Sequence, residues 1–395
     1  MSERTLRGKA AISGVGESVY YRHGRSPVPE FVLTLHAILA ACEDAGVHPS
    51  DIDGFSSYAM DRNGPVRLAA ALNVREMRYA TMHWEGGGGG MAAAVGNAAT
   101  AVATGQANCV VAFRGLAQGE VGRFGRSFRT SGKVWGGQAY NAPYGVGSPG
   151  QFFAFKFQRW MHEHGGVGLK AQKAVSLASY HHAQQNPRAV MHGRPLTSEA
   201  YDESRMIVEP WRLYDFCQEN DGAAAIIVTT PERAREGAHR PVYLLAAAQG
   251  ANQGWGRGVM NSPTYATANF TQMAARLWEM AGVTADDVDV VQAYENFTGA
   301  VVMSLVEHGI CEPEAADEVL TFENLTAGSG RWPLNTSGGN LAEAYVHGLN
   351  LAVEGVRQLR GDSVNQVADP NVCLVAAGPM TAPISDLVLG TEATL

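Results

Sequence analysis

Two stretches of this chain carry the same helix-turn-strand pattern, and this internal repeat limits the possible folds more than any other feature of the sequence. Residues 41–55 read ACEDAGVHPSDIDGF, and residues 277–291 read LWEMAGVTADDVDVV. A shift of 236 positions aligns an Ala-Gly-Val turn and two aspartates in the two copies. Each copy is typical of a helix that ends at a glycine C-cap and leads through a short turn into a strand.

A second match follows each copy, in the same order. In the first half it consists of the glycines 86–90, an Ala-rich helix over 91–105 and an apolar strand over 109–115. In the second half it consists of the Ser-Gly-Gly turn 337–339, a helix over 341–361 and a strand over 372–378. These matches predict an α/β chain of two similar lobes, residues 1–240 and 241–395. We expect buried helices to begin at Gly90 and near Asn340.

Residues 116–215 have no counterpart in the second half, so they form an insertion within the first lobe. The first part of the insertion is rich in glycine, basic and aromatic residues, and the second part alternates helical segments with proline and glycine breaks. Long insertions on a compact scaffold usually serve as lids or binding loops. We therefore expect a lid-like cover over a pocket between the two lobes.

The charge and the hydropathy pattern exclude several classes of partner. A net charge of -8 provides no basic field for a nucleic-acid backbone, so we expect no nucleic-acid partner. No apolar run reaches the roughly 18 residues that cross a bilayer, and the N-terminal residues lack the apolar core of a secretory signal. These features predict a cytoplasmic chain with no membrane span.

The cysteines and histidines do not form a metal-binding pattern. The 5 cysteines are widely scattered, and none forms the close pair of a zinc or redox motif. Four histidines lie in the insertion without the spacing and third ligand of a zinc site: His162, His164, His181 and His182. We expect reduced thiols, solvent-facing histidines and no metal site.

The run Asn-Asp-Gly-Ala-Ala-Ala at 220–225 is followed by the apolar residues IIVTT, which predicts an acidic turn that leads into a buried strand. This run looks like the Asp-Gly-Ala-Ala-Ala element of thiolases. Together with the repeat, the insertion and the glycine-rich turns, it makes the chain similar to the thiolase superfamily from about residue 8 to residue 392. Within that superfamily the chain resembles the sterol-carrier-protein thiolases and the bacterial lipid-transfer proteins.

The resemblance implies a five-layered α-β-α-β-α fold built from two similar halves. It also implies a homodimer, because the first-half sheet of the family has an edge strand that pairs with its twin. Residues 109–113 form an apolar stretch that we expect to lie near that edge. A further implied partner is a small zinc-ribbon and OB-fold protein that binds acyl-CoA.

The nucleophile of that family is missing here. Thiolases carry an acylated cysteine in a Cys-x-x-Gly turn at the start of a buried helix, whose dipole helps to stabilise a thiolate. The matching stretch of this chain runs from His83 to Gly90, and Gly87 takes the place of the nucleophile. We expect no covalent acyl-enzyme, and we expect a flexible turn with room for a bulky substrate group.

Two other family motifs carry tyrosines at their catalytic positions. The Asn-Glu-Ala-Phe motif appears as Tyr294-Glu295-Asn296-Phe297, and Tyr345 matches the histidine of the Gly-His-Pro motif. Cys373 has no glycine two residues later, so it does not match the acid/base Cys-x-Gly motif. We predict that Tyr294 and Tyr345 are catalytic, although buried tyrosines also occur as ordinary core residues. The predicted substrate-binding residues are His83, Gly87, Glu295, Asn296, Gly339 and His347.

Two facing phenols suit carbon–carbon cleavage without a covalent intermediate. One phenol accepts the proton of a β-hydroxyl, and the other protonates or stabilises the enolate of the thioester. This is a retro-aldol reaction on a 3-hydroxyacyl-CoA, and it resembles that of the actinobacterial thiolase-like aldolases of steroid side-chain degradation, which release a 17-ketosteroid and a short acyl-CoA. We assign Tyr294 to the β-hydroxyl and Tyr345 to the enolate. Coenzyme A then enters as part of the substrate, and no other cofactor is required.

Two further functions agree with the loss of the cysteine. The chain can be an inactive thiolase-like subunit that binds lipid or acyl-CoA, or a thioester hydrolase in which Glu85 or Glu295 activates water. Four basic residues of the insertion either contact the phosphates of coenzyme A or only keep an acidic protein soluble. They are Arg123, Arg126, Arg129 and Lys133.

Overall fold

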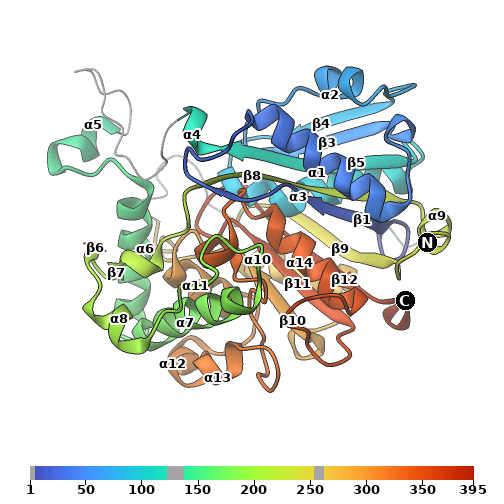
Figure 1. Cartoon of the computed structure of the whole chain (residues 1–395). Helices are drawn as coiled ribbons and strands as arrows, with labels where there is room; N and C mark the ends of the chain where they lie inside the picture. The colour runs from blue at the N-terminus through green and yellow to red at the C-terminus, as the bar shows by residue number, and fades with distance from the viewer. Residues whose placement is uncertain (1–4, 122–137, 253–261) are drawn as a thin grey trace.

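The computed structural model describes residues 5–121, 138–252 and 262–395 of the chain (Figure 1). Its strands are β1 (Ala11–Glu17), β2 (Tyr21–Arg22), β3 (Gly54–Tyr58), β4 (Tyr79–His83), β5 (Cys109–Ala117), β6 (Met206–Val208), β7 (Trp211–Arg212), β8 (Asn220–Thr229), β9 (Val242–Gly250), β10 (Val290–Ala293), β11 (Val372–Ala377) and β12 (Ile384–Gly390). Its longer helices are α1 (Glu30–Ala45), α2 (Pro65–Ala71), α3 (Met91–Ala103), α6 (Pro149–Glu163), α7 (Leu169–Gln185), α10 (Thr271–Ala281), α11 (Thr298–Glu307) and α14 (Leu349–Arg360). The shorter helices are α4 (Gln118–Val121), α5 (Gln138–Asn141), α8 (Ser198–Glu203), α9 (Pro231–Arg235), α12 (Ala316–Val319) and α13 (Phe322–Leu325).

One large sheet passes through both halves and repeats the same strand order. From the centre outward, the first half places β1, β8, β5, β3 and β4 side by side, and the second half places β9, β12, β11 and β10 in the same arrangement. Where the first half has β4, Leu334 forms a parallel bridge with Val291 of β10. The two half-sheets join where β1 and β9 run antiparallel, with Ala11 opposite Tyr243. The predicted match of sheet order between the halves is confirmed.

The helices complete five layers around the two half-sheets. Helix α1 covers the outer face of the first half-sheet, where it packs against β1, β8 and β5. Helices α3 and α14 lie between the half-sheets, and each contacts strands of both halves. Helix α10 packs on β9 and β12, and α11 packs on β10, on the outer side of the second half-sheet. The predicted α-β-α-β-α architecture is therefore confirmed.

The repeated residues have the same structural role in each half. Both copies end their helix, α1 or α10, at a glycine in the left-handed region with a φ of 63°. Asp53 then accepts a hydrogen bond of 2.8 Å from the backbone amide of Cys109, at the start of β5. Asp289 accepts the equivalent hydrogen bond of 3.0 Å from Val372, at the start of β11. The repeat thus fixes the amino ends of neighbouring parallel strands.

The second central helix begins later than predicted. The expected helix over 341–361 exists only from Leu349 onward, although α3 begins directly after Gly90 as expected. Residues Gly339–Glu343 form a single π-helical turn, and Ala344 is fully extended. The side chain of Asn350 donates to the carbonyl of Ala344 at 3.0 Å and so satisfies the break in the helix. The prediction of a helix near Asn340 is wrong, because these residues form a separate segment.

We had expected the strand at 109–113 to lie near the sheet edge, but it lies in the interior of the sheet. It belongs to β5, which lies between β3 and β8 and is buried along its whole length, as interior strands are. The edge of the first half-sheet is β4. The described part of the insertion packs on the second half, where α7 contacts α11 and the π-helical turn (Figure 1). The lobe boundary at residue 240 stays a prediction.

Candidate active site

Tyr294 and Tyr345 meet in the interior of the molecule. Their phenol oxygens lie 2.6 Å apart in a hydrogen bond, and the centres of their rings are 6.0 Å apart. Tyr294 is 2% exposed and Tyr345 is 7% exposed. The structure therefore brings together the two tyrosines that the sequence singles out, and it joins them directly.

The ring of Tyr294 lies between the first turns of the two central helices. A Cβ atom at Gly88, just before α3, would overlap the Tyr294 ring and its hydroxyl. A Cβ atom at Gly348, the N-cap of α14, would lie 2.5 Å from the same ring. Both glycines are required because the phenol occupies the space of their missing side chains.

The glycine run before α3 is a closely packed turn and not the flexible turn that we had expected. A Cβ atom at Gly378 would overlap the backbone of Gly89, so the loop after β11 presses against the run. Gly87 differs, because its φ is 52° and no atom lies within 4 Å of the position of its missing Cβ atom. The space beside Gly87 is the one open position of this turn where a substrate group could fit.

The segment that carries Tyr345 is anchored by residues from distant parts of the chain. The amide of Tyr345 donates to Oδ1 of Asn220 at 2.6 Å, and Asn220 begins the Asn-Asp-Gly-Ala-Ala-Ala run of β8. The hydroxyl of Tyr58, at the end of β3, donates to the carbonyl of His347 at 2.9 Å. The first half thus holds the segment of the second half that carries Tyr345.

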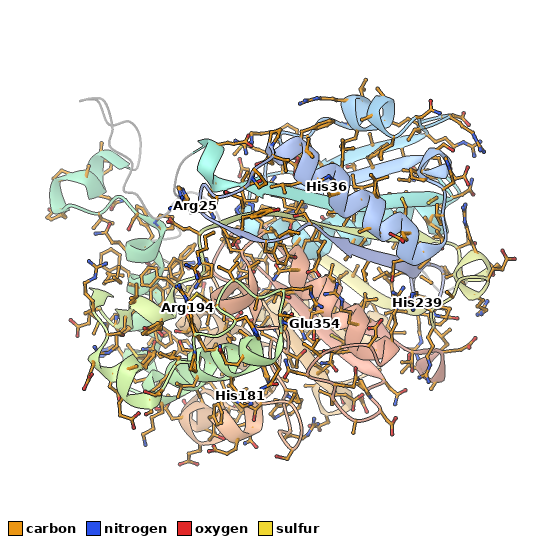
Figure 2. All side chains as sticks on the ribbon, in the orientation of Figure 1. Arg25, His36, His181, Arg194, His239 and Glu354 are labelled. Carbon is orange, nitrogen blue, oxygen red and sulfur yellow. The ribbon has the colours of Figure 1, made fainter. Side chains whose placement is uncertain are left out.

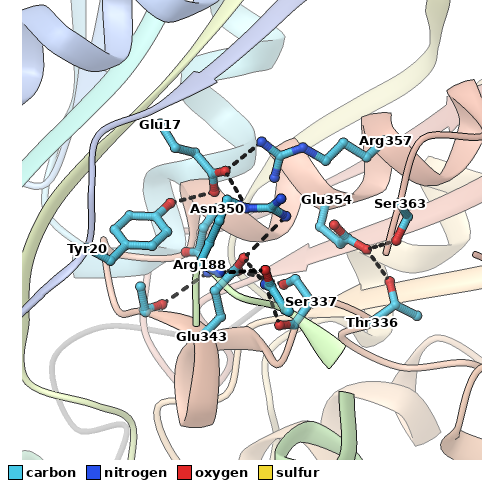
Figure 3. Close-up of polar contacts among 12 residues, drawn as sticks. Glu17, Tyr20, Arg188, Thr336, Ser337, Glu343, Asn350, Glu354, Arg357 and Ser363 are labelled. Carbon is cyan, nitrogen blue, oxygen red and sulfur yellow. Dashed lines mark hydrogen bonds and ion pairs between the residues drawn. The ribbon is translucent and has the colours of Figure 1, made fainter. Parts of the chain in front are cut away.

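A buried polar network supports the same segment from behind (Figure 3). Glu343 accepts hydrogen bonds from Ser337 at 2.6 Å, Asn186 at 2.9 Å and Asn350 at 3.1 Å. Burial raises the pKa of the Glu343 carboxyl to about 8. Its backbone carbonyl also accepts from the amide of Val190 at 2.8 Å, so the insertion is tied to the segment that carries Tyr345.

Beyond this network lies a cavity of about 910 Å³ on the side of α1 and α14. Glu17 lies at its wall, where it pairs with Arg357 at 2.6 Å and with Arg188 at 3.5 Å, and Tyr20 donates to it at 2.5 Å. A second cavity of about 240 Å³ lies between α7, α8 and α13. Neither cavity is lined by the tyrosine pair.

Burial makes the groups of the site electrically neutral. It raises the pKa of both phenols above their usual value, so neither tyrosine is ionised at neutral pH. Burial also raises the pKa of the Glu295 carboxyl and lowers the pKa of His83 and His347. Burial therefore favours the neutral form of the phenols, the imidazoles and the carboxyl, and each neutral form can donate a hydrogen bond.

The other predicted site residues lie around the tyrosines and have partners of their own. His83 ends β4, and its Nδ1 lies 2.9 Å from the side-chain oxygen of Gln249 on β9. Glu295 is buried beneath Gly339 and accepts from the amide of Asn340 at 2.8 Å. The side chain of Asn296 accepts from the next amide at 3.0 Å. His83 thus lies on the first half, and Glu295 and Asn296 lie on the second half. Glu85, the other candidate base, is exposed.

The described residues contain no group of three or more His, Cys, Asp or Glu side chains that could hold a metal ion. Figure 2 shows His36, His181 and His239 on separate elements. No helix in the described ranges is long and apolar enough to cross a membrane. The four basic residues that we considered for phosphate binding lie outside the described residues.

Sequence reasoning missed several residues around the tyrosine pair. Arg114, within β5, donates from Nε to Nδ1 of His347 at 3.1 Å and pairs with Asp61 at 3.0 Å. An arginine at the end of the apolar run CVVAFRG was a signal, because a buried charge needs a partner. Cys217 packs against the buried cluster that contains both tyrosines, and nothing in the sequence marks it.

Known proteins resemble the whole chain. The family described as Thiolase C-terminal domain-like matches residues 251–391. A 17-hydroxy-3-oxo-4-pregnene-20-carboxyl-CoA lyase of Mycobacterium tuberculosis is 39% identical over 393 residues, which cover 98% of this chain and 100% of the relative. A steroid side-chain-cleaving aldolase of Thermomonospora curvata is 37% identical over 400 residues, which cover 98% of this chain and 99% of the relative.

The fold agrees with these relatives. A solved structure named Ltp2-ChsH2(DUF35) aldolase superposes with a TM-score of 0.88 and 35% sequence identity, and covers 98% of this chain and 99% of its own. The similarity includes both halves and the insertion between them. The chain therefore belongs to the thiolase superfamily, within its group of steroid side-chain-cleaving aldolases.

Proposed function

We propose that this chain cleaves the bond between the α- and β-carbons of a 3-hydroxyacyl-CoA by a retro-aldol reaction. The observation that carries the proposal is the hydrogen bond of 2.6 Å between the phenols of Tyr294 and Tyr345. The names of two relatives that align over nearly their full length describe a steroid carboxyl-CoA lyase and a steroid side-chain aldolase. The proposed substrate is a steroid side-chain CoA thioester, and the products are a ketone and a short acyl-CoA.

The tyrosine pair acts as a proton relay in this reaction, because both phenols keep their protons at neutral pH. The β-hydroxyl of the substrate gives its proton to Tyr294 while the carbon–carbon bond breaks and the hydroxyl carbon becomes a ketone. Tyr294 passes its own proton to Tyr345, and Tyr345 protonates the α-carbon of the thioester enolate. The pair accepts one proton and delivers one, so no free phenolate has to form.

The surroundings of the pair suit an enolate. The first turns of α3 and α14 both lie against the Tyr294 ring, and helix N-termini carry partial positive charge. The enolate oxygen is where negative charge develops in a retro-aldol reaction, so donors fixed beside it lower the barrier. Glycine at positions 87 and 88 leaves this turn without a nucleophile, so the proposed route has no acyl-enzyme.

The test removes each hydroxyl and keeps each ring. Tyr294→Phe and Tyr345→Phe should each lower kcat by about two to four orders of magnitude, with little change in substrate binding. Mass spectrometry of the products should identify the ketone and the shorter acyl-CoA. Tyr243→Phe is the matched control, because Tyr243 is also buried, carries a hydroxyl that bonds to Glu392 at 3.4 Å, and lies on β9.

Other outcomes would indicate a different function. If either phenylalanine variant kept more than about a tenth of the wild-type turnover, the relay would be wrong. Binding of acyl-CoA without cleavage, with all partners present, would identify an inactive subunit. Free coenzyme A among the products would identify a thioester hydrolase.

We also propose a homodimer that forms through β4, the edge of the first half-sheet. An edge strand offers unpaired backbone groups to a second strand. Met82 on β4 is 40% exposed, and Trp84 directly after it is 83% exposed, so apolar side chains flank this edge. Light scattering at micromolar concentration should give the mass of a dimer, and Trp84→Glu should shift it toward the monomer.

A small zinc-ribbon and OB-fold protein is the second proposed partner. The solved relative is named for two components, Ltp2 and ChsH2(DUF35), which supports this proposal. Equal activity of the isolated chain and of the complex would remove this partner. We propose a cytoplasmic location and no cofactor other than the coenzyme A of the substrate. A chain that is dialysed alone against a chelator and then recombined with the untreated partner should therefore keep full activity.

A further inference from the structure

Three side chains form a buried line that ends at Tyr345. Oδ2 of Asp61 lies 3.0 Å from Nη1 of Arg114, and the two side chains are 1% and 6% exposed. Nε of Arg114 lies 3.1 Å from Nδ1 of His347. The ring of His347 meets the ring of Tyr345 edge to face, with centres 5.3 Å apart. The line therefore connects a buried ion pair of the first half with a tyrosine of the proposed relay.

The ion pair is built with more than two partners. Asp61 also accepts from the amide of Gly115 at 3.0 Å and from the side chain of Asn63 at 2.8 Å. Burying two charges is expensive, and apolar residues of similar size often stabilise a protein more than a buried pair does. The Asp61–Arg114 pair has several hydrogen-bond partners, and its guanidinium also donates to a histidine. We infer that the pair has a role beyond stability.

The direction of the hydrogen bond fixes the state of the imidazole. A guanidinium donates and does not accept, so Nδ1 of His347 has to be the acceptor. The proton of the neutral ring then lies on Nε2. The φ of His347 is 50°, a conformation that is rare for a residue with a side chain, and Tyr58 bonds to its carbonyl at 2.9 Å. The segment is therefore held by its backbone and by its ring.

We propose that Arg114, held by Asp61, is a positioning residue that fixes His347 as the neutral Nε2–H tautomer beside Tyr345. The imidazole then supplies an uncharged donor next to the proton relay, and it does not compete with Tyr345 for the relayed proton. This inference rests on the proposed retro-aldol function. Asp61 lies shortly after β3 and Arg114 lies within β5, so the first half controls the protonation of the second-half segment.

The groups around His347 agree with a ring that stays neutral. Arg114 faces it from β5, Tyr58 faces it from β3, and Tyr345 faces it from its own segment, while Asp61 lies behind Arg114. Burial and the neighbouring guanidinium hold the pKa of His347 well below its usual range. Between about pH 5 and 8 the imidazole should carry no charge.

The experiment reads the tautomer without relying on turnover. In ¹⁵N-histidine spectra of the ligand-free chain, the ring of His347, assigned by its loss in His347→Gln, should give one Nε2–H tautomer that does not titrate from pH 5 to 8. The double variant Asp61→Asn, Arg114→Met removes both charges and the donor to Nδ1. It should give a mixture of both tautomers and a kcat about 10 to 100-fold lower, with KM little changed.

Two further variants separate this role from simple stability. Arg114→Lys keeps a positive charge for Asp61 but lacks the planar guanidinium that also reaches His347, so it should also give both tautomers. This variant tests the proposal even if the double variant fails to fold. Asp44→Asn, Arg360→Met removes an ion pair of 2.7 Å between α1 and α14. This control should lower stability and leave the His347 spectrum unchanged.

The outcomes are distinct. A single Nε2–H tautomer in both Arg114 variants would overturn the proposal, as would an unchanged kcat in a variant with mixed tautomers. If the tyrosine variants showed that the chain is not an aldolase, the spectra would still report whether Arg114 fixes the ring.

Discussion

The two halves of this chain agree at the amino ends of their strands and differ at the carboxyl ends. Asp53 and Asp289 cap the starts of β5 and β11 in the same way. At the opposite ends, the first half presents a tight glycine turn before α3, and the second half presents Tyr294 after β10 and a π-helical turn before Tyr345. In α/β folds the amino ends of strands serve stability and the carboxyl ends carry sites, so the duplicated scaffold persists while the site diverges.

The largest effect should follow from adding one methyl group to the glycine turn. In Gly88→Ala the new Cβ would overlap the Tyr294 ring, so the phenol must move away from Tyr345. We expect the turnover of the thioester to fall about a hundredfold or more, as for loss of a positioned acid or base. Thermal unfolding should show that the variant still folds, and turnover within a factor of ten of wild type would mean that the turn does not set the Tyr294 position.

A smaller effect should be shared by the two halves. Asp53→Asn and Asp289→Asn each replace a carboxylate that accepts backbone hydrogen bonds, and each should lower the free energy of unfolding by about 1 to 3 kcal/mol. The loss should be larger for Asp53, which is the more buried of the two. Urea unfolding measures both losses. A fall of kcat in only one variant would contradict the view that the amino ends of the strands serve stability and not the site.

The second-half segment should make a large contribution to the pH dependence of stability. Burial raises the pKa of Glu343 from an ordinary value near 4.5 to about 8, so the folded chain holds a proton that the unfolded chain releases. Its contribution to stability is complete below about pH 4.5 and is lost as the pH rises to about 8. Urea unfolding of Glu343→Gln should therefore depend less on pH, by up to about 1.4 kcal/mol per pH unit.

If the free energy of unfolding changed with pH equally in the wild type and in Glu343→Gln, the pKa of Glu343 would not be raised by folding. Glu76→Gln is the control, because Glu76 is exposed and bonded only to the neighbouring Arg78 at 2.8 Å. Burial also raises the pKa of Asp215, in residues 1–240, to about 6, so its contribution to stability is lost at a lower pH than that of Glu343.

The smallest effect concerns the open position of the glycine turn. Gly87→Ala places a side chain at a φ of 52°, which should cost about 1 to 2 kcal/mol of stability, but no atom lies within 4 Å of the new Cβ. The relay should stay intact, so kcat should be close to that of wild type. A rise of KM for the thioester would show that the substrate occupies this space, and a loss of kcat would contradict the division between positions 87 and 88.

Local patterns in the sequence predict the scaffold well. The repeat predicts the matching strand order of the two halves, because its aspartates and glycine caps form bonds at the ends of neighbouring elements. The glycine run predicts the start of α3. The break before Leu349 could not be predicted, because Glu343 on the segment before it is held by Asn186, which is distant in the sequence. The tyrosines follow from motif positions, whereas Arg114 and Asp61 become site residues only when β3 and β5 bring them to His347.

The hydrogen bond between Tyr294 and Tyr345 has a consequence for consecutive turnovers. In the proposed relay, a proton that passes through the two hydroxyls leaves both of them turned around: Tyr345, which accepts from Tyr294 before the reaction, donates to it afterwards. The enzyme that has just released its products is therefore set for the reverse reaction, the aldol addition. Both hydroxyls have to rotate about their C–O bonds before a second cleavage, and a ketone that remains bound during that time can be joined again to the acyl-CoA.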